Sequence, residues 1–241
     1  MTLTLTRSEK IFGGVCLLLQ TLLVPFAVTA LCMAQGNPSD ALINLICFFC
    51  NALLALVFFR RLLVRSWRNA ARAWKRTLAV TAKGFGLYWA INLLITAAIL
   101  ALRPDFANAN DAGVNAMIDE YPVLMTVAVI FAAPLAEECL FRGWIFTGLS
   151  QKSVPLAYCV SCGLFAAAHL VGYVGSYDGV SLLRCLLQYI GPCFVLCRIC
   201  READSLAAPL ALHMLINTLG CILLRRFLCR KSCNNPPISP T

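Results

Sequence analysis

The stretch AAPLAEECLFRGWIF, residues 132–146, decides the fold because it carries charged side chains inside a long apolar segment. This segment extends over residues 122–149, and a helix needs only about 20 mainly apolar residues to cross a bilayer. Glu137, Glu138 and Arg142 lie well inside it. A charged side chain at this depth costs about 2.5–3.5 kcal/mol or more unless it is paired, so all three residues are candidates for function.

The composition extends this interpretation to the whole chain. Of its 241 residues, 60% are hydrophobic and 13% are charged, whereas a soluble domain averages about 45–50% and about 25%. Too few charged side chains remain to cover a soluble core. This excludes a disordered chain, a secreted disulfide-rich miniprotein and an ordinary cytosolic enzyme, and it predicts an integral membrane protein.

The apolar segments predict the fold class. Their length and composition indicate an all-α fold. We expect a polytopic integral membrane helical bundle with about seven transmembrane helices, and the sequence does not decide whether there is an eighth. The segments are residues 11–33, 41–59, 84–102, 122–149, 154–171, 181–199 and 206–228.

The basic residues predict the orientation. The net charge is +9, and a basic loop at residues 60–83 contains no acidic residue. Such loops lie on the cytoplasmic side against anionic lipid, so we expect a cytoplasmic N-terminus and membrane lipid as a partner, with no nucleic acid. After seven spans the basic tail lies outside, which leaves open a re-entrant or eighth short element. The basic tail residues are Arg225, Arg226, Arg230 and Lys231.

The cysteines suggest no site by themselves. The chain has 14, and most lie in apolar segments, where a free cysteine packs as a small hydrophobic residue. Three pairs have CxxC spacing, but each lacks the second pair of ligands that a zinc site needs, so we interpret the spacing as chance. The pairs are Cys47/Cys50, Cys159/Cys162 and Cys197/Cys200.

Helical spacing pairs several of the polar residues. Glu138 and Arg142 are four residues apart and can form an ion pair on one helical face. Glu137 points about 100° away from them. This arginine therefore does not obviously neutralise Glu137, and a purely structural charge cluster would not need the second carboxylate.

Both histidines of the chain lie in apolar segments. His169 follows Phe165 by four residues, and His213 precedes Asn217 by four. Counted from the turn near Lys152, Glu137 and His169 lie roughly 22 and 25 Å along their helices, so they can face each other. A single membrane histidine is more often an interhelical hydrogen-bonding group, and the coincidence with Glu137 favours a shared chamber.

A carboxylate, two imidazoles and a carboxamide in a buried chamber suit hydrolysis. The carboxylate with a histidine can activate water, and imidazole and carboxamide N–H groups can stabilise an oxyanion. Glu137, His169 and His213 are also a legitimate metal-ligand set, which keeps zinc open. The sequence contains neither an HExxH motif nor a GxSxG motif.

Together the motifs EExxxR (Glu137, Glu138, Arg142), FxxxH (Phe165, His169) and HxxxN (His213, Asn217) resemble those of the CPBP family. This family comprises the type II CAAX prenyl endopeptidases and their bacterial relatives, also called Abi proteins. The resemblance covers residues 120–225 and implies an intramembrane peptidase. On this basis we divide the chain into N-terminal membrane helices with the basic loop (1–119), a CPBP/Abi-like protease core (120–228) and a polar tail (229–241).

The resemblance also implies roles for the site residues. Glu137 and His169 would activate water, His213 and Asn217 would form the oxyanion hole, and Glu138, Arg142 and Phe165 would support them. The expected substrate is a peptide or lipidated protein, of CAAX or bacteriocin type, in a bacterial plasma membrane. No cofactor is required by this mechanism. The alternatives are a non-catalytic membrane immunity or scaffold protein and a proton-coupled transporter.

Overall fold

The computed structural model describes the backbone of residues 3–36 and 39–234, and the side chains of these residues up to 223. The described residues form helices and one isolated bridge, between Val174 and Tyr177. In chain order the elements, with η for π-helical or 3₁₀ segments, are α1 (Arg7–Leu18), η1 (Leu19–Leu23), α2 (Val24–Ala34), α3 (Asp40–Phe58), α4 (Arg60–Arg72), α5 (Trp74–Leu102), α6 (Ala109–Glu120), α7 (Pro122–Val127), η2 (Ala128–Ala132), α8 (Ala133–Glu137), η3 (Glu138–Phe146), α9 (Thr147–Ser150), α10 (Val154–Leu170), η4 (Val171–Tyr173), α11 (Gly179–Ala203) and α12 (Ala207–Asn234).

The predicted all-α membrane bundle is confirmed. Six continuous helical stretches are long and apolar enough to cross a membrane, and the apolar part of α12, Ala207–Leu223, is a shorter seventh. The six are Arg7–Ala34, Asp40–Phe58, Trp74–Leu102, Pro122–Ser150, Val154–Tyr173 and Gly179–Ala203.

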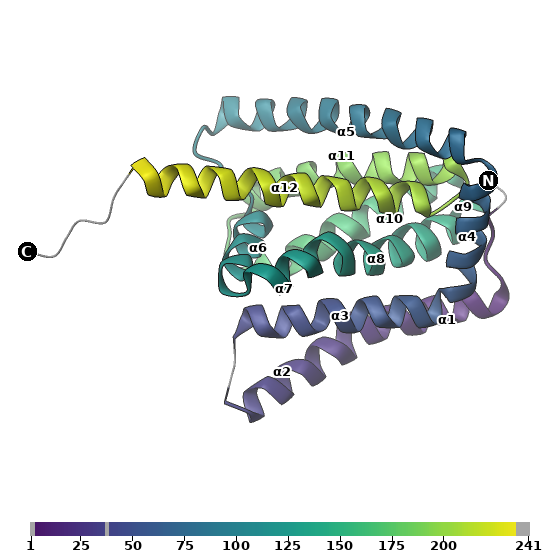
Figure 1. The fold of residues 1–241 in the computed structure, drawn as a ribbon, viewed down its shortest axis with the longest axis horizontal. Coiled ribbons are helices and arrows are strands. Elements are labelled where there is room, and N and C mark those ends of the chain that lie inside the picture. Colours follow the sequence, from purple (N-terminus) through teal and green to yellow (C-terminus); the bar gives the residue numbers. More distant parts are fainter. Residues whose placement is uncertain (1–2, 37–38, 235–241) are drawn as a thin grey trace, which may run out of the picture.

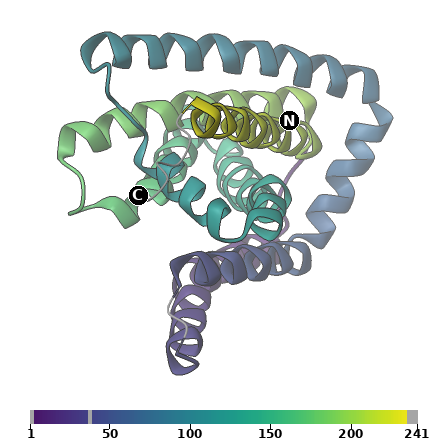
Figure 2. The same cartoon turned by 60° about the vertical axis from the view of Figure 1, so that its left-hand side comes forward.

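The stretch from α7 to α9, which carries the two glutamates, is surrounded by other helices (Figures 1 and 2). It packs against α3, α10 and α12, while α11 packs on α5, α10 and α12. Half of its most apolar window is buried inside the protein, against 6% for α5. The packing of this stretch among other helices thus keeps its polar side chains away from lipid.

The predicted basic loop between the second and third spans contains a helix, because residues 60–72 form α4 and α5 already begins at Trp74. Helix α4 crosses one end of the bundle between α3 and α5 (Figure 2). Leu62, Ser66 and Ala70, spaced by four, face the protein, while the arginines at 60, 61, 68 and 72 are exposed. The high charge concealed this amphipathic periodicity, which is typical of a helix lying along a surface.

The predicted outer loop between the third and fourth spans also contains a helix, α6. At the other end of the chain, α12 continues from Ala207 to Asn234 as one helix, so its described part contains no re-entrant turn. It runs to the end of the bundle opposite the N-terminus and α4 (Figure 1). The two basic segments of the chain therefore lie at opposite ends.

Two prolines explain where the long helices widen. Pro25 and Pro134 have no N–H to donate to the carbonyls four residues earlier, at Thr21 and Ile130. Those carbonyls lie in η1 and η2, which are π-helical turns. A third π-helical segment, η3, contains no proline and begins at Glu138. Such widened turns occur often at functional sites, and here two of them flank the short helix α8 that ends at Glu137.

Helix α11 begins at an N-cap outside the spans. The carboxylate of Asp178 accepts hydrogen bonds from the hydroxyl of Ser181 at 2.6 Å and from the amides of Val180 and Ser181 at 3.0 Å each. These hydrogen bonds, first of all that from the Ser181 side chain, lower the pKa of the Asp178 carboxyl. The carboxyl group of the cap thus stays ionised at neutral pH, and its negative charge interacts favourably with the positive end of the helix dipole.

Candidate active site

Glu138 and Arg142 form the buried base of the site. Arg142 Nη1 donates to Glu138 Oε1 at 3.0 Å, and the two side chains are 0% and 1% exposed. The ion pair predicted from their spacing is therefore present. It lies inside η3, where the hydroxyls of Thr147 and Ser161 donate to the carbonyls of Arg142 and Phe141.

His213 of α12 adds a second donor to Glu138. Its Nδ1 lies 2.8 Å from Glu138 Oε1, so this nitrogen carries the proton that the carboxylate accepts. Its other nitrogen, Nε2, lies 3.8 Å from Glu137 Oε2. Glu138 thereby fixes the ring so that Nε2 faces Glu137, a link that the sequence did not predict.

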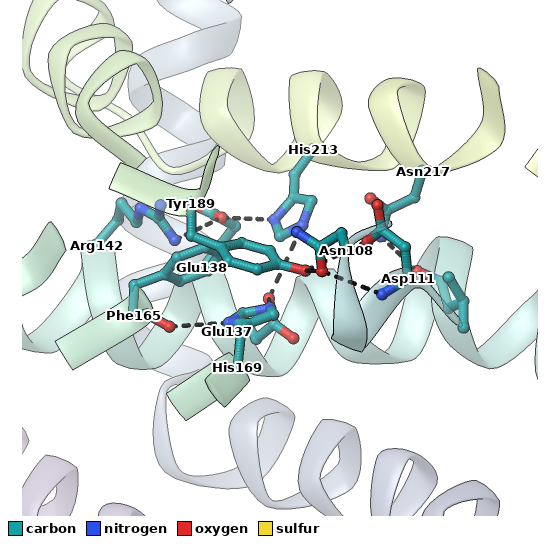
Figure 3. Close-up of polar contacts among 11 residues, drawn as sticks. Asn108, Asp111, Glu137, Glu138, Arg142, Phe165, His169, Tyr189, His213 and Asn217 are labelled. Atoms are coloured by element: carbon teal, nitrogen blue, oxygen red, sulfur yellow. Dashed lines mark hydrogen bonds and ion pairs between the residues drawn. The ribbon is translucent and has the colours of Figure 1, made fainter. Parts of the chain in front are cut away.

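His169 of α10 approaches Glu137 from the other side (Figure 3). Its Nδ1 donates to the carbonyl of Phe165 at 2.8 Å, which turns Nε2 toward Glu137 Oε2 at 3.9 Å. The similar depth predicted for Glu137 and His169 on neighbouring helices agrees with this contact.

Phe165 packs among the charged groups. Its ring lies 4.3 Å below the guanidinium carbon of Arg142, and its centroid is 4.4 Å from that of His169 and 6.2 Å from that of His213. The aromatic ring therefore gives the buried cation a π face and packs against the imidazoles. The supporting role expected of Phe165 from the FxxxH motif stays a prediction.

The three groups that face one another are the accessible part of the site. The side chains of Glu137, His169 and His213 are 23%, 18% and 10% exposed, in contrast to the closed Glu138–Arg142 pair. Glu137 Oε2 accepts no hydrogen bond from the described residues. If both imidazoles are neutral, Glu137 Oε2 and the two Nε2 atoms are all hydrogen-bond acceptors. A donor such as water is then required between them.

Asn217 lies one turn beyond His213 on α12, but it does not contact the other site residues through a hydrogen bond among those described. Its Nδ2 donates to the carbonyl of Val129 in η2 at 2.8 Å. An amide nitrogen carries two N–H groups, so one remains for a ligand. The expected oxyanion role of Asn217 stays a prediction.

Glu137, His169 and His213 are the donors that a zinc ion would use, but their three ligand atoms do not all lie within 4.8 Å of one another. Tetrahedral zinc with bonds of about 2.0–2.1 Å holds its ligand atoms about 3.3 Å apart. The Glu137 oxygen is 3.9 and 3.8 Å from the two nitrogens. For zinc these two distances must shorten by about half an ångström, and the two histidine nitrogens must also approach each other, whereas a water hydrogen-bonded to Glu137 and one histidine needs no such movement.

The sequence interpretation missed Tyr189. Its ring stacks on His169 with centroids 4.6 Å apart and an angle of 27°, and its hydroxyl lies 3.3 Å from Asp111 Oδ1 and 3.4 Å from Asn108 Oδ1 of the α6 segment (Figure 3). Asn108 in turn donates to Gln188 at 2.8 Å. A tyrosine in an apolar span is common, so no sequence signal set this one apart.

The stack predicts a positioning role for Tyr189. Tyr189→Leu removes the ring that holds the His169 imidazole and should lower kcat by about tenfold to a hundredfold, the effect of a small misplacement. Tyr189→Phe retains the stack and should stay near the wild type. Turnover numbers and pH profiles of the two variants check this, and equal kcat in the leucine variant and the wild type would exclude the role.

Comparison with known proteins finds a family model over the part of the chain that carries the three motifs. The family model "Type II CAAX prenyl endopeptidase Rce1-like" matches residues 119–219, which contain every predicted site residue. The UPF0177 protein YxdF of Lactococcus lactis subsp. lactis (strain IL1403) is 26% identical over 132 residues, 54% of this chain and 68% of that protein. No solved structure matches the chain significantly. Over residues 119–219 the chain is therefore similar to the Rce1-like CAAX prenyl endopeptidases, the family that its motifs resemble.

Proposed function

We propose that this chain is an intramembrane endopeptidase in which Glu137 activates water for attack on a peptide bond. The observation that carries the proposal is the meeting of Glu137 Oε2 with the Nε2 atoms of His169 and His213, at 3.9 and 3.8 Å. These side chains are partly exposed, whereas the ion pair beneath them is buried. Such a polar cluster is costly within a membrane protein, which favours a functional origin.

In the first step, Glu137 takes a proton from a water held between its carboxylate and His169. The hydroxide oxygen then attacks the carbonyl carbon of the substrate. Because the hydrogen bond to Phe165 fixes the His169 ring, the water is held in one orientation. A positioned general base of this kind contributes about 10²–10⁴-fold to the rate.

In the second step, the tetrahedral intermediate requires donors for its oxyanion. His213 would supply one as an imidazolium that keeps both of its N–H protons throughout the cycle, with Nδ1–H donating to the carboxylate of Glu138 and Nε2–H to the oxyanion. The free N–H of Asn217 supplies another. When the C–N bond breaks, Glu137 returns its proton to the leaving nitrogen, which restores the starting state.

The substrate class follows from the location of the cluster within the spanning helices. We infer a membrane-associated peptide or lipidated protein, with a CAAX-like or bacteriocin-type precursor as the leading classes. We also infer a bacterial plasma membrane with the α4 end of the bundle in the cytoplasm, because the exposed arginines of α4 suit an anionic inner leaflet.

Zinc is the alternative that the ligand set allows. Glu137, His169 and His213 would hold it, and it would supply Lewis-acid polarisation of the carbonyl. We expect hydrolysis by the purified protein to persist after exhaustive chelation and dialysis, with metal content measured by elemental analysis. Loss of hydrolysis on chelation and its recovery with zinc would replace the metal-free mechanism.

Isotope labelling tests the proposed hydrolysis without a known substrate. Purified protein in liposomes is incubated with membranes from cells lacking it, in H₂¹⁸O, and new C-termini are identified by mass spectrometry. We expect peptides that carry one ¹⁸O in a new carboxyl group and that are absent with Glu137→Gln. If no such peptides form, or if they also form with the variant, the proposal is wrong.

A further inference from the structure

Three thiols meet in the core beneath the proposed site. Cys162 of α10 and Cys193 and Cys197 of α11 have sulfur atoms that all lie within 4.8 Å of one another. The residues are 7%, 0% and 0% exposed. All three belong to the apolar core that also contains Phe165, and the described cysteines form no disulfide.

The cluster does not follow the CxxC spacings. Cys162 and Cys197 each belong to such a pair, but their neighbours Cys159 and Cys200 are not part of the cluster. Cys162 instead meets a thiol of the adjacent helix, and Cys193 completes the group one turn before Cys197. Sequence spacing within a pair could not reveal a site assembled between two helices.

A buried arginine with two unpaired nitrogens lies beside the thiols. Arg142 is fully buried, and its Nε and Nη2 donate to no acceptor among the described residues. Its guanidinium lies within electrostatic range of all three thiols. A buried donor without an acceptor costs about 1–3 kcal/mol, so this side of the guanidinium favours an anion. Neutral thiols are weak acceptors, whereas thiolates are anionic ones.

We propose that Cys162, Cys193 and Cys197 bind one thiophilic d¹⁰ metal cation, with Arg142 compensating the charge of the thiolates. Binding breaks three S–H bonds, releases three protons and forms three metal–sulfur bonds, with no change in oxidation state. Thiolates select Zn²⁺ and Cu⁺ over hard cations, and Cd²⁺ is a spectroscopic probe of the same chemistry.

Geometry and charge both suit this cation. Metal–sulfur bonds of about 2.3 Å place tetrahedral sulfur ligands about 3.8 Å apart, so the cluster needs to contract by at most about 1 Å. A divalent ion with three thiolates carries one net negative charge, and it would lie beside the positive charge of Arg142, which Glu138 shares from the other side. Because Arg142 also holds Glu138, occupancy of this site would be linked to the orientation of His213.

Titration with Cd²⁺ under non-thiol reducing conditions tests the site in the purified full chain. We expect one ion per chain by elemental analysis, a thiolate-to-metal absorption band, and competition by Zn²⁺ or Cu⁺, whichever binds. Cys193→Ala should weaken binding by at least tenfold, while Cys159→Ala, an exposed position on α10, should bind as the wild type does. Equal binding by both variants, or no binding by the wild type, would overturn the proposal.

A second measurement needs no variant of the buried core. One Cd²⁺ bound to three neutral thiols releases about three protons at pH 7, whereas neutral imidazoles and a carboxylate release almost none. We therefore expect about three protons per ion from the wild type and the same from Glu137→Gln. Release of fewer than two protons, binding lost in Glu137→Gln, or a disulfide that persists after reduction would contradict the site. The result does not depend on whether the protein is a peptidase.

Discussion

Replacing Glu137 with glutamine is expected to reduce hydrolysis by about 10²–10⁴-fold while leaving the protein folded. Glutamine keeps the size of the side chain but cannot take a proton from water. Glu137 Oε2 accepts no hydrogen bond from the described residues, so the substitution removes no native contact of that oxygen. We expect the thermal unfolding temperature to stay near that of the wild type.

Initial rates in liposomes measure this effect, on a peptide found by the isotope experiment. Glu202→Gln is the matched control, because Glu202 undergoes the same chemical change on the exposed part of α11, where it pairs with Arg198 at 2.7 Å. This control should retain the wild-type rate. A Glu137→Gln variant that cleaves as fast as the control would exclude Glu137 as the base.

Replacing Glu138 with alanine is expected to have the largest effect on stability. It leaves Arg142 buried without a counter-ion and removes the acceptor for His213 Nδ1. Removing one partner of a buried ion pair costs about 3–5 kcal/mol, because the remaining charge stays desolvated. The variant should unfold at a markedly lower temperature in detergent, or fail to accumulate in membranes.

Two companion variants identify the cause of this effect. Glu202→Ala also breaks an i,i+4 pair with an arginine, but an exposed one, and should change the unfolding temperature little. Glu138→Gln keeps an oxygen acceptor and should be less destabilised than the alanine variant, while it loses the charge that supports a protonated His213. A wild-type unfolding temperature in Glu138→Ala would contradict the importance of the buried pair.

Local spacing predicted the parts of the site that lie within one helix or one hairpin. Four-residue spacing predicted the pair of Glu138 and Arg142. Similar distances from a shared turn predicted that Glu137 and His169 lie at the same depth and face each other. Both inferences rest on the fixed rise of a helix. Apolar segment lengths likewise predicted the membrane bundle, since the bilayer sets the length of a span.

Contacts between distant helices could not be predicted in the same way. The bond between Glu138 and His213 joins residues 75 positions apart, and Tyr189 reaches His169 from a third helix. Neither side chain carries a periodic signal that identifies its partner. The thiol cluster was missed for the same reason, and α4 was missed because its charges outweighed its apolar face.

The central claim is that Glu137 makes this chain a peptidase, and comparative peptidomics of living cells tests it most directly. Cells that produce equal amounts of the wild type, Glu137→Gln or Glu202→Gln are compared for short peptides and new protein C-termini. We predict a defined set of products in wild-type and Glu202→Gln cells that is absent from Glu137→Gln cells; a C-terminal tripeptide would indicate CAAX-like cleavage, and a leader fragment would indicate precursor maturation. Identical peptide profiles in all three strains would contradict the claim.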